Sequence, residues 1–123
     1  MIKKMVPVLL ATGLGMLAPA TSRAATPTTL AGTEAAAYKG DYQAQRNLAY
    51  GYVAFSYEGQ VKNPIAGCAW YLVVLHSGSP KVHEGDVGNV RVYCGRLDVD
   101  AQSAAVAQAR TIYRKVYRHS PDF

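Results

Sequence analysis

The chain has 123 residues, a formal net charge of +5 and an isoelectric point near 9.3, and half of its residues are hydrophobic. This length fits one small domain and excludes a barrel or doubly wound enzyme of ordinary size. The hydrophobic fraction excludes a disordered chain, and two cysteines are too few for a disulfide-dense miniprotein. The basic isoelectric point suggests a nucleic-acid partner only if the excess positive charge lies on the folded domain.

Residues 1–24 have the layout of a secretory signal peptide. Lys3 and Lys4 precede an uncharged, mostly apolar run over 5–18, and small residues follow at the positions that signal peptidase reads. The alternative is a membrane anchor, but a run of about 14 residues is shorter than the roughly 20 that span a bilayer. We therefore expect a periplasmic or secreted protein.

Cleavage is expected after Ala24, with Ala20 as the second choice. It would remove Lys3, Lys4 and Arg23 and leave a chain of 99 residues with ten basic and eight acidic residues, a formal charge of about +2. Most of the apparent basicity then belongs to the signal peptide. We therefore expect no nucleic-acid partner, and contact with an anionic membrane surface is open but not favoured.

The two cysteines, Cys68 and Cys94, permit one intramolecular bridge. Thiols exported to an oxidising compartment usually pair, so we expect a disulfide, with two buried free thiols as the alternative. Closing a loop of this length stabilises a domain by about 3–4 kcal/mol in the chain-entropy model.

In chain order, residues 25–32 are expected to be a flexible leader, followed by a helical domain over 33–119. A short helix starts at Thr33 as N-cap and stops at Gly40, and Asp41 caps a second helix that runs to about Tyr57. The apolar face of this second helix is predicted from residues at three- and four-residue steps. It comprises Ala44 or Gln45, Leu48, Ala49, Tyr52 and Phe55.

The third helix is the buried centre of the predicted domain. Asn63 and Pro64 form a strong start signal, no charged residue follows before Ser77, and Gly78 is the stop. Trp70 is predicted to be a core anchor. The main buried stripe of this third helix is predicted to comprise Ile65, Cys68, Ala69, Leu72 and Leu75.

Two further segments complete the domain. Asp86 is the predicted N-cap of a helix to Leu97, although the alternation over 90–94 also allows a short strand. Asp98 or Asp100 caps the last helix, which runs to about Arg118. Residues 120–123 are a tail. The buried stripe predicted for the last helix comprises Ala105, Ala109, Ile112, Tyr113 and Val116.

The segment over 40–52 resembles the opening of a Sel-one-like repeat, a relative of the tetratricopeptide repeat. It carries Gly-Asp, Ala-Gln, Asn-Leu and Tyr in the family's order, and Trp70-Tyr71 and Gly78 follow with the family's spacing. The link between the two helices is about two residues longer than usual, and the pair over 86–118 is either a degenerate repeat or a capping pair. The resemblance implies an all-α domain of antiparallel hairpins stacked as a short solenoid, and a protein-interaction scaffold.

No familiar catalytic pattern is present. No serine lies in a Gly-x-Ser-x-Gly elbow, the expected disulfide consumes both thiols, and the acidic residues lie near predicted helix ends. We expect no catalysis, cofactor or metal, and a protein or peptide partner in the cell envelope. The expected contacts are Arg46, Tyr50 and Tyr71, which lie off the main buried stripes.

The alternative is a small envelope enzyme or enzyme inhibitor. Its polar site would comprise His76, His83, Glu84 and Asp86. Convergence of these side chains in one pocket would favour this alternative, whereas a hollow lined by tyrosines would favour the interaction module.

Overall fold

The computed structural model describes residues 13, 15 and 26–123. The predicted signal peptide therefore lies almost entirely outside the described residues. The described part is all-helical, without strands: α1 (Leu30–Tyr38), α2 (Tyr42–Val53), α3 (Pro64–Leu75), α4 (Glu84–Asn89), the π-helix η1 (Val90–Cys94) and α5 (Val99–Tyr117). No helix among these residues is both long enough and apolar enough to span a membrane.

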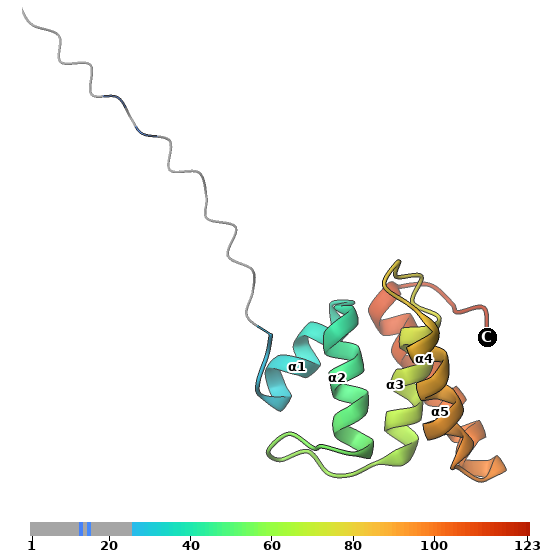
Figure 1. Cartoon of the computed structure of the whole chain (residues 1–123). Helices are drawn as coiled ribbons and strands as arrows, with labels where there is room; N and C mark the ends of the chain where they lie inside the picture. Colours follow the sequence, from blue (N-terminus) through green and yellow to red (C-terminus); the bar gives the residue numbers. More distant parts are fainter. Residues whose placement is uncertain (1–12, 14, 16–25) are drawn as a thin grey trace, which may run out of the picture.

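The apolar helix α3 lies at the centre, as predicted. It contacts α2, α4, η1 and α5, and it lies between α2 and α4 (Figure 1). Trp70 is 3% exposed, with its ring edge-on to Tyr38, which confirms its role as a core anchor. The buried core cluster comprises Ala37, Ala44, Leu48, Ala49, Ala69, Trp70, Tyr71, Val73, Ala109 and Ile112.

Three predicted N-caps are confirmed. The side chains of Asp41, Asn63 and Asp98 accept hydrogen bonds from the third backbone N–H that follows each of them, at 2.7–3.1 Å. These bonds satisfy donors that have no partner inside the helix. Of the two candidates for α5, Asp98 is therefore the cap.

The first helix begins earlier than predicted. Thr29 is its N-cap and accepts a hydrogen bond from Gly32, so residues 30–32 are helical and do not belong to a flexible leader. Thr33, the predicted cap, is buried inside α1, and its hydroxyl donates to the Thr29 carbonyl.

The second helix ends at Val53 and does not reach Tyr57. Ala54 has φ of −138°, which ends the helical path. Phe55 therefore leaves the predicted buried face and is 76% exposed.

The third helix buries more than its predicted stripe. Cys68 and Ala69 are fully buried, but Ile65, Leu72 and Leu75 are only half-buried. The other faces are buried instead because α3 has neighbours on several sides. The fully buried residues of α3 are Ala66, Gly67, Cys68, Ala69, Trp70, Tyr71, Val73 and Val74.

The segment before Leu97 differs most from prediction. The N-cap of α4 is His83, and Asp86 is the third residue of the helix, where its side chain accepts from the His83 N–H. Residues 90–94 form a π-helix, which overturns the strand alternative. In α5 the predicted stripe is confirmed, with Val116 half-buried.

Residues 120–123 have no regular structure, but they are not detached from the domain. The Phe123 ring stacks on His76 at 4.4 Å between centroids, and the Phe123 carbonyl accepts a hydrogen bond from Arg110.

Candidate functional site

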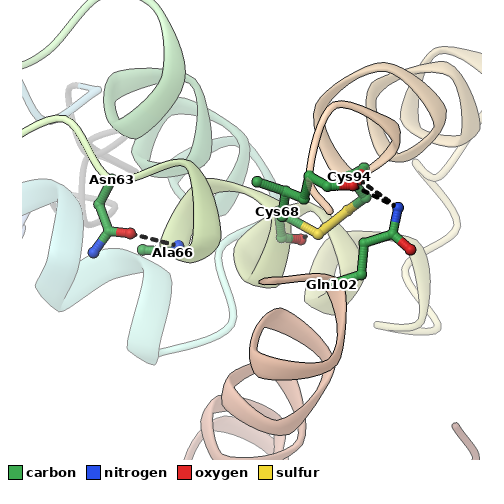
Figure 2. The surroundings of a disulfide bond; sticks show 6 residues. Asn63, Ala66, Cys68, Cys94 and Gln102 are labelled. Atoms are coloured by element: carbon green, nitrogen blue, oxygen red, sulfur yellow. Dashed lines mark hydrogen bonds between the residues drawn. A yellow bond between two sulfur atoms is a disulfide. The ribbon is translucent and has the colours of Figure 1, made fainter. Parts of the chain in front are cut away.

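The disulfide joins the centre of the fold to its most irregular helix. Cys68 on α3 bonds to Cys94 at the end of η1, as predicted, and no free cysteine remains among the described residues. Figure 2 shows the Gln102 side chain from α5 reaching the same place, where its amide donates to the Cys94 carbonyl at 3.0 Å. The same carbonyl, which a helix end leaves without a partner inside the helix, also accepts from the Leu97 N–H at 3.1 Å. The disulfide therefore ties η1 to α3, and the Gln102 hydrogen bond ties it to α5.

A second link crosses from α2 to α4. Arg46 Nε lies 2.9 Å from Asp86 Oδ1, and the Asp86 side chain is completely buried while that of Arg46 is 26% exposed. The second carboxylate oxygen accepts from the Tyr42 hydroxyl at 2.6 Å and from the His83 N–H at 3.1 Å. A buried carboxylate requires such partners. Burial, followed by the hydrogen bond to Asp86, raises the pKa of Tyr42.

The predicted contact residues Arg46, Tyr50 and Tyr71 lie around one hollow. Its volume is about 240 Å³. We call it the first hollow. It is lined by Gln43, Arg46, Asn47, Tyr50, Tyr71 and Asn89.

The three predicted contact residues differ in what they expose. Tyr50 is 42% exposed and lies beside the exposed ring of Phe55, at 5.8 Å between centroids. Tyr71 is only 2% exposed and stacks on Tyr93 at 5.3 Å. Tyr71 therefore forms the floor of the hollow, and Tyr50 and Arg46 form its accessible rim. Burial raises the pKa of Tyr71, with a smaller contribution from Tyr93, so its hydroxyl stays neutral in ordinary buffers.

The residues of the alternative site do not form one site. Asp86 is held by Arg46 and Tyr42, and the Nδ1 atom of His83 accepts from the Gly85 N–H at 2.9 Å. Glu84 lines a hollow together with Arg91, and none of the other three residues of the alternative site lines it.

His76 also lies apart from that cluster, at the C-terminal end of α3, where it stacks on Phe123. Burial lowers its pKa, partly opposed by Asp122. In the part of the chain that the structure describes, no three His, Cys, Asp or Glu side chains are grouped to hold a metal ion.

Sequence reasoning missed two residues that shape this region. Tyr42 holds Asp86, and Tyr93 stacks on the floor of the first hollow. A signal for Tyr93 was available in the predicted disulfide. Tyr93 precedes Cys94, and Tyr71 lies about one turn after Cys68, so bridging the cysteines brings these rings near each other.

No protein-family model, curated protein or solved structure matches this chain.

Proposed function

We propose that the protein is an exported interaction module that binds a peptide segment of an envelope protein in the first hollow, without catalysing a reaction on it. The observation that carries this proposal is the grouping of Arg46, Tyr50 and Tyr71 around one hollow. Tyrosine and arginine are among the residues enriched in binding hot spots. Tyrosine provides a large contact area at a small entropy cost, and the arginine guanidinium provides several hydrogen-bond donors in a fixed geometry.

The rim is also prepared for binding before a partner arrives. The buried Asp86 carboxylate fixes Arg46, and a hydrogen bond of 2.8 Å between Gln43 and Asn47 fixes two further side chains beside it. Side chains that are already ordered lose less entropy on binding. The rest of the hollow offers amide groups that can bond to a peptide backbone.

Two broader features agree with the proposal. A disulfide is compatible with an oxidising compartment outside the cytoplasm, to which residues 1–24 would direct the chain. The proposed arrangement is that of a Sel-one-like hairpin, α2 with α3, followed by a degenerate pair made of α4, η1 and α5. Stacked helical repeats bind their partners on extended concave surfaces.

The test uses a photoreactive phenylalanine derivative placed at position 50 in cells that express the protein. The same derivative at position 57 is the matched control, because Tyr57 is a tyrosine of the same region that does not line the first hollow. Mass spectrometry of the crosslinked peptides should identify a specific partner segment from position 50 and not from position 57.

A synthetic peptide of that segment then measures the binding directly. The purified oxidised protein should bind it, and Tyr50→Ala should weaken binding about 5- to 30-fold while Tyr57→Ala leaves it unchanged. Equal crosslinking from both positions, or equal affinity of the Tyr50→Ala variant, would contradict the proposal.

A further inference from the structure

The structure contains a second hollow of about 240 Å³. It is lined by Val53, Lys62, Pro64, Tyr93, Arg96 and Leu97. Tyr71 lines the first hollow and Tyr93 the second, and these two rings are stacked on each other. The two hollows therefore meet at this aromatic pair.

The lining residues of both hollows follow the same helix faces. On α3, Tyr71 and Pro64 are seven residues apart, which is two turns. On α2, the lining continues from the first hollow at Tyr50 to the second at Val53, one turn later. From Gln43 to Val53 the axis of α2 rises about 15 Å, which matches four or five residues of extended peptide. One short peptide is thus long enough to cross both hollows.

The second hollow differs from the first in charge. Lys62 and Arg96 are both exposed at its edge, and no acidic residue lines either hollow. The only ion pair among the described residues joins Arg46 to Asp86, so neither of these two cations is neutralised by a carboxylate. The Arg96 guanidinium lies over the Tyr93 ring at 5.2 Å, which holds it beside the hollow.

The remaining walls of the second hollow are apolar. Val53, Pro64 and Leu97 provide aliphatic surface in the same hollow as the two cations. An acidic residue alone would leave this surface in water, and an apolar residue alone would leave the cations without a partner. The combination fits an apolar side chain followed by a carboxylate.

Resting on the proposed function, we propose that the second hollow binds an acidic side chain, with its apolar neighbour, of the same peptide that occupies the first hollow. Arg46 at the other end is already neutralised by Asp86, so the two ends are electrostatically unequal. The peptide is therefore held in one direction, with its acidic residue at Lys62 and Arg96.

The experiment selects peptides of seven random residues, all amidated at their C-terminus, against the purified oxidised protein. Amidation removes the terminal carboxylate, so any acidic preference comes from side chains. The selected peptides should be enriched in Asp or Glu next to an apolar or aromatic residue. Replacing that acid by its amide should weaken binding about three- to tenfold, and added salt should reduce the difference.

The decisive variant reverses both cations, Lys62→Glu with Arg96→Glu, and should select basic peptides in place of acidic ones. Arg114→Glu with Lys115→Glu is the matched control. It changes the net charge equally on exposed residues of α5 that line neither hollow, and it should leave the selection unchanged.

The inference and the proposed function fail in different ways. Peptides that bind through Tyr50 but show no acidic preference would overturn the inference and leave the proposed function standing. The inference would also be overturned if the Lys62→Glu, Arg96→Glu protein and the control protein select the same peptides. It would likewise be overturned if peptides without an acidic side chain bind equally well once their terminal carboxylate is free. Failure to select any peptide that depends on Tyr50 would overturn both.

Discussion

The α2–α3 hairpin and the region formed by α4, η1 and α5 pack on each other but are held by different interactions. The hairpin is held by close contact of small residues: a Cβ atom on Gly67 would lie 2.3 Å from Val53 Cγ1. The α4–η1 segment is held by individual links, namely the disulfide, the Arg46–Asp86 ion pair and the hydrogen bond from Gln102. Packing distributes stability over many atoms, whereas each link concentrates it in one pair.

The largest expected effect comes from removing the disulfide. Cys68→Ala with Cys94→Ala should lower the free energy of unfolding by about 3–4 kcal/mol, because the unfolded chain regains the freedom of a loop of 26 residues. Urea unfolding measures the change. A reducing agent should reproduce it in the wild type and have no effect on the double variant. A loss below about 1 kcal/mol would show that the links matter less than the packing.

The ion pair should give the next effect, and it should be asymmetric. Arg46→Ala leaves the fully buried Asp86 carboxylate without its cation and should cost about 2–3 kcal/mol, since the bonds from Tyr42 and His83 remain. Asp86→Asn should cost less, because the Arg46 side chain is partly exposed and can be hydrated. Equal losses in thermal or urea unfolding would contradict this account of the link.

The packing of the hairpin is tested at Gly67. Gly67→Ala should cost about 1–2 kcal/mol, because the added methyl group overlaps Val53. In a protein that already carries Val53→Ala, the overlapping methyl group is absent. Gly67→Ala should therefore cost much less there than in the wild type. Simple addition of the two single effects in unfolding experiments would show that α2 and α3 are not held at this contact.

The smallest effect is a pH dependence at His76, the residue that stacks on Phe123 of the tail. Burial lowers the pKa of His76, so the folded state disfavours its protonated form. The contribution of this group to stability is therefore complete above its unfolded pKa of 6.5 and is lost as the pH falls toward the lower folded value. NMR titration of the His76 ring should give a pKa below 6.5. Asp122→Asn should lower it further, and a rise in that variant would contradict the assignment.

The two regions also differ in how well the sequence predicts them. Asp41, Asn63 and Asp98 were identified as caps because capping depends on residues three apart in the chain. Asp86 is predicted to be the N-cap of its helix. It takes part in the capping as the third residue, where it accepts from the His83 N–H, but its other partners are Arg46 and Tyr42, about 40 residues earlier. Local spacing therefore predicts that Asp86 lies at a helix start, but it does not reveal the long-range contacts.

In the candidate site, too, local spacing predicts some features, whereas contacts between distant segments of the chain determine others. Placing Arg46 and Tyr50 off the buried face of α2 followed from helical periodicity, and the structure puts both at the rim of one hollow. Tyr71 also lies off the predicted buried stripe of its helix, but it is buried and its ring stacks on Tyr93 of η1. Tyr93 lies in the π-helix η1, and the helical periodicity of the sequence does not predict a π-helix there.

The central claim is that the two adjoining hollows bind one peptide. Backbone amide shifts of the isotope-labelled, oxidised protein, followed by NMR during titration with a selected acidic peptide, test it most directly. The account predicts shifts confined to α2 over 43–53, to residues 62–71 of the loop and α3, and to residues 89–97. Shifts centred on α1 or on the exposed face of α5, with these segments unchanged, would contradict it.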